Sequence, residues 1–210
     1  MYKSTSISMS TSIKEVKEKE EKEEKEEEPG KLTLVCGPMF SGKTSHLIST
    51  YKEHSADSIV INFCDDNRYS KTLLSNHDKV MIPCIKLKQL SDLETMLEFV
   101  LFKDAIKTIF IDEGQFYEDL VPQVLKFLEV YKKNVFVYGL DSDFRREKFG
   151  TLLDLIPHTD EFVHLKANCN MCGGQNNATY SQRVTNEQNI VVIGSSNYIP
   201  LCRKCYIKSI

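Results

Sequence analysis

Short apolar runs alternate with segments of helical spacing along the middle of the chain, from residue 31 to about residue 166. Apolar and often β-branched runs predict strands at 31–36, 58–63, 80–85, 108–111 and 134–140. Apolar residues three and four positions apart predict helices at 45–51, 91–103 and 118–131, with Ser91 as the N-cap of the second. This alternation predicts an α/β fold with a parallel sheet covered by helices, whose ligands bind at the carboxyl ends of the strands.

A glycine-rich motif stands between the first predicted strand and the first predicted helix. It reads Gly37-Pro38-Met39-Phe40-Ser41-Gly42-Lys43-Thr44. Its glycines let backbone N–H groups converge on an anion, and the helix adds its positive N-terminal end. In this context the motif predicts a phosphate-binding loop, in which Lys43 reaches the β- and γ-phosphates and the Thr44 hydroxyl faces Mg²⁺. The chain is therefore expected to bind a nucleoside triphosphate.

Charged residues follow two of the later strands. Asp112 and Glu113 end the run 108–111. Asp112 is predicted to hold Mg²⁺, and the adjacent carboxylate can take the proton of a nucleophile. The strand 58–63 leads into a polar loop that contains Arg68. That arginine could reach the charge that develops at the γ-phosphate, or it could pair with neighbouring carboxylates on the surface.

Two Cys-x2-Cys pairs mark a change of character after residue 166. They are Cys169 with Cys172 and Cys202 with Cys205, and 29 residues separate the pairs. Four thiolates suit tetrahedral Zn²⁺ and leave no open position for catalysis, so the pattern predicts a structural zinc. The excursion between the pairs predicts a β-rich hairpin. It could cover a second substrate and exclude water, or it could only stabilise the fold.

Charge and composition indicate the location and the partners. Residues 1–30 hold 6 Lys and 9 Glu with little to bury, which predicts a disordered charged tail. The rest of the chain carries 21 basic and 21 acidic residues, and this neutrality argues against a nucleic-acid-binding domain. No apolar run approaches the roughly 20 residues of a membrane span, and the N-terminus lacks the apolar region of a signal peptide. A cytoplasmic protein that binds neither membrane nor nucleic acid is expected.

The motifs together resemble type II (cytosolic) thymidine kinases over nearly all of residues 31–206. They occur in the order of that family: 37–44, Asp66-Asn67-Arg68-Tyr69, Ile111-Asp112-Glu113-Gly114-Gln115-Phe116, Leu140-Asp141 with Phe144 and Phe149-Gly150, and the two cysteine pairs. The resemblance implies ATP-dependent phosphorylation of the 5′-hydroxyl of thymidine or deoxyuridine, in the salvage of DNA precursors. It also implies a homotetramer that thymidine triphosphate inhibits.

The resemblance further implies a division of the chain. It implies a P-loop, RecA-like nucleotide-binding α/β domain (31–166) and a small zinc-ribbon domain (167–210) that carries a lasso loop over the base. The charged tail (1–30), predicted from its composition, lies outside the resemblance. Structural Zn²⁺ would be bound by the four cysteines, and Mg²⁺ would accompany ATP beside Thr44 and Asp112.

The resemblance also implies roles for individual residues. Glu113 matches the general base. The ATP site would comprise Gly37, Pro38, Met39, Phe40, Ser41, Gly42, Lys43, Thr44, Asp66, Asn67, Arg68, Asp112 and Gln115. The nucleoside site would comprise Met39, Phe116, Leu140, Phe144, Ser181, Tyr198 and the lasso residues Ile190, Val191, Val192, Ile193 and Gly194, whose backbone would bind the pyrimidine edge.

The chain departs from the family pattern at three places. Asp143 stands where a small hydroxyl residue is common, Ser181 stands where threonine is usual, and the segment from Gly194 to Tyr198 is one residue short. Two other classes of protein share parts of the pattern: ATPase motors or helicase-like proteins, and zinc-ribbon binding modules with a degenerate ATP site. The neutral body argues against the first. The intact Lys43, Asp112 and Glu113 argue against the second.

Overall fold

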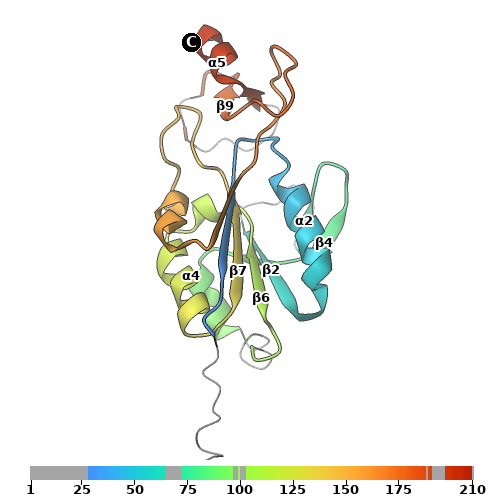
Figure 1. The fold of residues 1–210 in the computed structure, drawn as a ribbon, viewed down its shortest axis with the longest axis vertical. Coiled ribbons are helices and arrows are strands. Elements are labelled where there is room, and N and C mark those ends of the chain that lie inside the picture. Colours follow the sequence, from blue (N-terminus) through green and yellow to red (C-terminus); the bar gives the residue numbers. More distant parts are fainter. Residues whose placement is uncertain are drawn as a thin grey trace, which may run out of the picture.

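A six-stranded parallel sheet forms the centre of the computed structural model, which describes residues 28–64, 72–96, 99, 103–187, 189–190 and 197–209. Its order is β5-β2-β6-β7-β1-β8, and every neighbouring pair runs parallel (Figure 1). The strands are β1 (Leu32–Cys36), β2 (Ser58–Phe63), β5 (Ile85–Leu87), β6 (Thr108–Ile111), β7 (Asn134–Gly139) and β8 (Glu161–His164). The predicted α/β fold with a parallel sheet is confirmed.

Each face of the sheet has its own cover, because successive side chains of a strand point to opposite faces. Val35, Val60 and Phe110 belong to the core on one face, and Leu34, Ile61 and Ile111 to the core on the other. The first face is covered by α2 (Lys43–His54), with the short 3-10 turn Ser55–Asp57 at its end, and by the hairpin β3 (Leu73–Ser75) and β4 (Met81–Pro83). The second is covered by α4 (Leu120–Glu129) and the 3-10 helices Leu90–Thr95 and Leu152–His158. Burial on both faces makes the sheet a rigid base for the loops at its carboxyl edge.

The strand predicted at 80–85 is instead two strands in different sheets. β4 pairs antiparallel with β3, whereas β5 pairs parallel with β2. The chain changes sheets at Cys84, whose backbone N–H donates to the Thr72 carbonyl at 3.0 Å. The sequence of residues 80–85 does not indicate this change of sheet, because both short strands are apolar and together look like one strand.

The helix predicted at 91–103 begins as the 3-10 helix Leu90–Thr95, and residues 97, 98 and 100–102 lie outside the described chain. Ser91 is not its N-cap. The backbone N–H groups of Leu90 and Ser91 donate to the Asp119 carboxylate at 3.1 and 2.8 Å. A side chain from another element therefore satisfies the first N–H groups of this helix.

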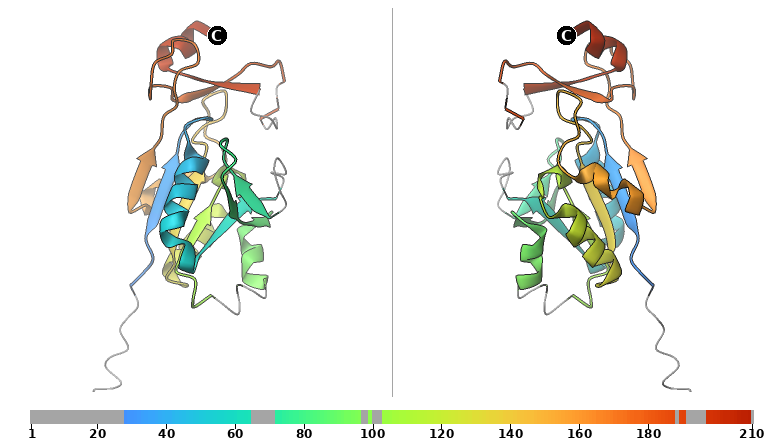
Figure 2. Two further views of the ribbon diagram at one scale, coloured as in Figure 1. Left: turned by 90° about the vertical axis from the view of Figure 1, so that its right-hand side faces the viewer. Right: turned by 90° about the vertical axis from the view of Figure 1, so that its left-hand side faces the viewer.

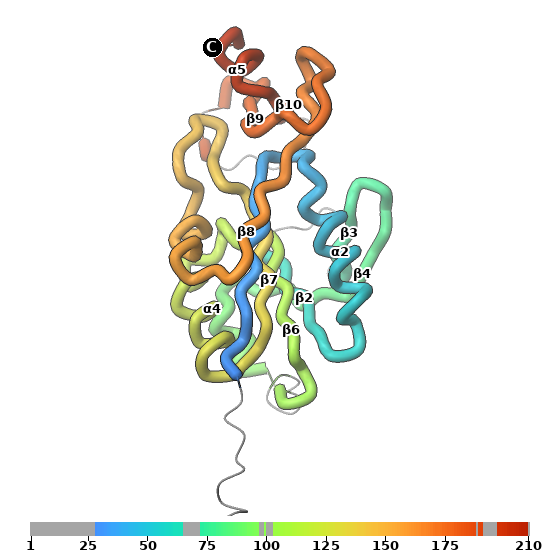
Figure 3. Tube along the Cα trace, in the orientation of Figure 1, coloured from blue at the N-terminus to red at the C-terminus, as the bar shows by residue number. Residues whose placement is uncertain are grey.

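The residues after β8 form a smaller lobe beyond the carboxyl ends of the central strands (Figures 1 and 2). Its elements are β9 (Tyr180–Arg183), β10 (Tyr198–Leu201) and α5 (Arg203–Ser209), and the two strands pair antiparallel. This lobe has its own small core, made of Ala167, Cys169, Ala178, Leu201, Cys205 and Tyr206. The tube view shows the chain passing from β8 into this lobe above β1 (Figure 3). Among the described residues, no helix is long and apolar enough to cross a membrane.

Candidate active site

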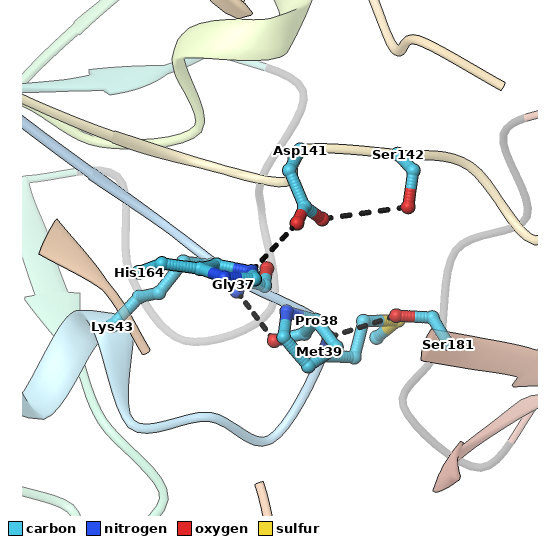
Figure 4. A network of polar contacts seen from close by, with 8 residues as sticks. All are labelled: Gly37, Pro38, Met39, Lys43, Asp141, Ser142, His164 and Ser181. Atoms are coloured by element: carbon cyan, nitrogen blue, oxygen red, sulfur yellow. Dashed lines mark hydrogen bonds and ion pairs between the residues drawn. The ribbon is translucent and has the colours of Figure 1, made fainter. Parts of the chain in front are cut away.

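The glycine-rich motif forms the turn between β1 and α2, at the carboxyl edge of the sheet (Figure 1). Gly42 is the N-cap of α2 with φ 83°, a left-handed conformation that glycine adopts without steric cost. Lys43 Nζ donates to the carbonyl oxygens of Gly37 and Pro38 at 3.0 and 2.8 Å (Figure 4). The lysine ammonium and the helix N-terminus therefore lie together, as an anion-binding site requires.

The Asp-Glu pair forms the turn that follows β6. Asp112 is only 3% exposed, and its backbone N–H donates to the Ile61 carbonyl at 2.8 Å. Glu113 has φ 54° and ψ 39°, a left-handed conformation that is unusual for a residue with a side chain. The next residue is Gly114, and a Cβ there would lie 2.7–2.8 Å from side-chain carbons of Leu152 and Val137. Tight packing behind the turn therefore fixes the backbone from which Glu113 projects.

Gln115 connects Glu113 to the loop that follows β7. Its Nε2 donates to Glu113 Oε2 at 2.7 Å, and its Oε1 accepts from the Leu140 backbone N–H at 2.9 Å. Gln115 is 4% exposed, and a Cβ at Gly139 would lie 2.5 Å from its Oε1, so only glycine leaves room for the amide. The Glu113 carboxylate is thus held relative to Leu140, and this gives Gln115 a positioning role.

Electrostatics link the Asp-Glu pair to the phosphate-binding loop. Burial lowers the pKa of Lys43, while the nearby carboxylates of Glu113, Asp112 and Asp141 oppose that shift. A bound phosphate chain would add negative charge and favour the protonated lysine. Asp112 and Thr44, the second residue of α2, supply the oxygen ligands that Mg²⁺ prefers. The donor set therefore fits a magnesium–nucleotide complex.

The aromatic residues predicted for the base pocket lie in two groups. Phe116 stacks on Phe63 at a centroid distance of 5.1 Å and meets the edge of Phe149 at 5.4 Å. Phe144 lies under the guanidinium of Arg183, whose carbon is 3.8 Å from the ring centroid, and the same guanidinium lies over Tyr198. The first group adjoins the turn that carries Glu113, and the second joins the β7 loop to the small lobe.

Ser181 joins the small lobe directly to the phosphate-binding loop. Its Oγ accepts a hydrogen bond from the Met39 backbone N–H at 2.9 Å (Figure 4). The hydroxyl of this buried serine therefore orients β9 over the loop. Two residues predicted to contact the nucleoside, Met39 and Ser181, are brought together.

Arg183 is a site residue that the sequence interpretation missed. It is 5% exposed, and its guanidinium donates to the carbonyl oxygens of Glu187, Asn189 and Ile190 and to the Tyr198 hydroxyl. These partners lie on both sides of residues 191–196. The sequence did offer one signal. Arg183 lies two residues after Ser181 in β9, and because side chains of a strand alternate between its faces, both point to the same, buried side.

The four paired cysteines meet in the small lobe, with their sulfur atoms within 4.8 Å of one another. The Sγ atoms of Cys172 and Cys202 are 3.9 Å apart. Burial alone would raise the pKa of Cys169, but hydrogen bonds from the backbone N–H groups of Cys202, Cys172 and Met171 and from the Cys172 thiol together outweigh it and lower that pKa to about 6. A cluster of four thiols with one favoured as thiolate fits the predicted zinc site.

Some predicted site residues lie outside the described chain. They are Asp66, Asn67 and Arg68 in the loop after β2, and Val191, Val192, Ile193 and Gly194 in the lasso. Their roles stay predictions. Of the lasso residues, Ile190 is described, and its carbonyl accepts from Arg183 at 2.9 Å.

Comparison with known proteins agrees with this geometry. The family model described as "Thymidine kinase" matches residues 30–206. The chain is 36% identical over 184 residues to a thymidine kinase of Oryza sativa subsp. japonica, covering 85% of this chain and 67% of that protein. It is 37% identical over 185 residues to one of Variola virus (86% and 98%) and 31% identical over 182 residues to one of Pseudothermotoga lettingae (85% and 96%). The chain therefore belongs to the thymidine kinase family.

Proposed function

We propose that this enzyme transfers the γ-phosphoryl group of ATP to the 5′-hydroxyl of thymidine, and also of deoxyuridine. One observation carries the proposal: Glu113 lies close enough to Lys43 for its charge to act on the ammonium, and Gln115 holds its carboxylate. A carboxylate beside a phosphate-binding lysine is suited to move a proton at the point where an acceptor hydroxyl meets the γ-phosphate.

In the proposed reaction, Glu113 accepts the 5′-hydroxyl proton while the oxygen forms a bond to the γ-phosphorus. The bond to the β,γ-bridging oxygen breaks, and ADP leaves. Lys43 and the backbone N–H groups of the loop hold the phosphates in place. The small lobe excludes water from the transferring group, which a kinase needs to avoid hydrolysing its donor. Ser181 contributes to this cover, since its hydroxyl binds the loop itself.

Base recognition is proposed for residues of the turn at Glu113, the loop after β7 and the small lobe. Phe116, Leu140, Phe144 and Tyr198 supply apolar surface there, and the lasso backbone would bind the pyrimidine edge. A pocket for one methyl group gives only about 1–3 kcal/mol of preference for thymine over uracil. Cytosine is rejected more strongly, because its reversed donor and acceptor edge leaves buried groups unpaired.

Two metals are part of the proposal. A structural Zn²⁺ bound by the four cysteines would hold the small lobe together, and residues 167–210 would form a zinc-binding domain. Mg²⁺ bound near Asp112 and Thr44 would neutralise phosphate charge. Four thiolate ligands suit a reducing compartment such as the cytoplasm.

Regulation and assembly follow only from the family resemblance. A homotetramer and feedback inhibition by thymidine triphosphate are therefore proposals as well. Light scattering of the purified protein would test the first, and titration of thymidine triphosphate into the kinase assay would test the second. A monomer, or activity that thymidine triphosphate leaves unchanged, would contradict them.

The proposed activity predicts a clear order among nucleosides. With ATP and Mg²⁺, the purified protein should convert radiolabelled thymidine and deoxyuridine to their 5′-monophosphates, whereas deoxycytidine should give little product. Separation of the labelled products measures all three rates. A folded protein that hydrolyses ATP but phosphorylates none of these nucleosides would contradict the proposal.

A further inference from the structure

Three side chains with metal-binding groups meet beside the phosphate-binding loop. They are Cys36, Asp141 and His164, and one ligand atom from each lies within 4.8 Å of the other two. His164 Nε2 is 2.9 Å from Asp141 Oδ2 (Figure 4). None of the three belongs to the proposed zinc, magnesium, ATP or nucleoside sites. We propose that this cluster is a further metal site that binds Zn²⁺.

The sheet itself places the three ligands. Cys36 is the last residue of β1, and its direct partners are His164 in β8 and Gly139 in β7, two residues before Asp141. Residues directly opposite on parallel strands point to the same face. The Leu165 backbone N–H donates to the Cys36 carbonyl at 2.8 Å and fixes this register. Two adjacent strands and the chain directly after a third therefore bring the ligands together at the edge of the central sheet, which favours a preorganised site.

The donor set selects the ion. A thiolate sulfur, an imidazole nitrogen and a carboxylate oxygen together suit Zn²⁺, whereas Mg²⁺ and Ca²⁺ prefer oxygen alone. The Cys36 thiol is buried, but the side chains of His164 and Asp141 are 35% and 19% exposed, so an ion can enter from their side. Zinc ligands lie roughly 3.3–3.7 Å apart, so the contact between His164 and Asp141 would widen by a few tenths of an ångström. Zn²⁺ would replace the Cys36 proton, which passes to solvent, and water would fill the fourth position.

The same three residue types could instead form a nucleophilic Cys-His-Asp arrangement, but the surroundings of Cys36 argue against it. Burial and the Asp141 charge raise the pKa of the Cys36 thiol to about 12, although Lys43 opposes the shift. A nucleophilic cysteine needs a lowered pKa and access to its substrate. Cys36 is 1% exposed, so a substrate carbonyl could not reach it.

Zinc uptake by the full-length protein tests the site without reference to kinase activity. The wild type and the variant His164→Gln would be equilibrated with a range of free Zn²⁺ concentrations, and the bound metal would be counted by elemental analysis. The wild type is expected to bind one more equivalent than His164→Gln, whatever the four C-terminal cysteines hold. Added Zn²⁺ should also raise the melting temperature of the wild type by several degrees more than that of the variant, because the ion binds only the folded site.

Two further variants sharpen the result. Asp141→Asn should lose the same equivalent as His164→Gln. His158→Gln, which removes an exposed imidazole from the end of the 3-10 helix Leu152–His158, should retain it. Equal zinc uptake by the wild type and His164→Gln would overturn the proposal, as would loss of the same equivalent in His158→Gln.

Discussion

Replacing Glu113 by glutamine is expected to lower kcat for thymidine phosphorylation by about 10²- to 10⁴-fold, the usual contribution of a positioned general base. Glutamine has the same shape but cannot accept the 5′-hydroxyl proton. Its carbonyl oxygen can still accept the hydrogen bond from Gln115 Nε2, which is 2.7 Å from Glu113 Oε2 in the wild type. The turn should therefore keep its geometry, and ATP binding, measured by calorimetry, should change little.

Glu118→Gln is the matched control for this variant. It makes the same chemical change at an exposed position five residues further along the chain. Its kcat should stay within a factor of about 2 of the wild type, as is usual for exposed substitutions. If Glu113→Gln retained nearly full kcat, another group would have to accept the proton. If both variants lost activity equally, loss of negative charge in general would be the cause.

The parts of this site that short-range sequence patterns encode were predicted correctly. The strand, turn and helix around residues 37–44 follow from local spacing alone, and so does the strand 108–111 that ends at Asp112 and Glu113. The four cysteines meet as the two short pairs indicated, because each Cys-x2-Cys pair is itself a compact turn. Such features need no knowledge of which strands are neighbours.

The parts that depend on contacts between distant segments were not predictable. Asp119 binds the start of the helix at Leu90, and no local pattern connects the two. The chain changes sheets at Cys84 because β4, before it, pairs with β3, whereas β5, after it, pairs with β2. The guanidinium of Arg183 contacts Phe144 of the β7 loop and binds carbonyls of residues 187–190, and the local sequence around Arg183 indicates neither contact. Likewise, Cys36 and His164 meet through the register of β1 and β8, which the sequence does not specify.

Replacing Arg183 by methionine is expected to raise KM for thymidine by about 10- to 100-fold. Methionine keeps much of the apolar bulk but loses the hydrogen bonds to the carbonyls of Glu187, Asn189 and Ile190. Each hydrogen bond from a charged donor is worth about 1.5–3 kcal/mol, so the ordered arrangement of this segment becomes a minor one. Apparent affinity falls with the fraction of binding-competent protein. Because Arg183 contacts neither Lys43 nor Glu113 in the described chain, the affinity for ATP should change much less.

A KM that rises for thymidine but not for ATP distinguishes this positioning role from a general loss of stability. Arg145→Met is the matched control, since Arg145 is exposed and its guanidinium also lies over Phe144, 5.0 Å from the ring centroid. Its KM for thymidine should stay near that of the wild type. Arg183→Lys keeps the charge, but a single ammonium cannot reach all three carbonyls as the planar guanidinium does. Its KM for thymidine should therefore fall between those of the wild type and Arg183→Met. Steady-state kinetics with each substrate varied in turn measure these values. Equal increases in the KM for ATP and for thymidine in Arg183→Met would show that the substitution disturbs the whole site. That result would contradict a specific role of Arg183 in holding residues 187–190 for nucleoside binding.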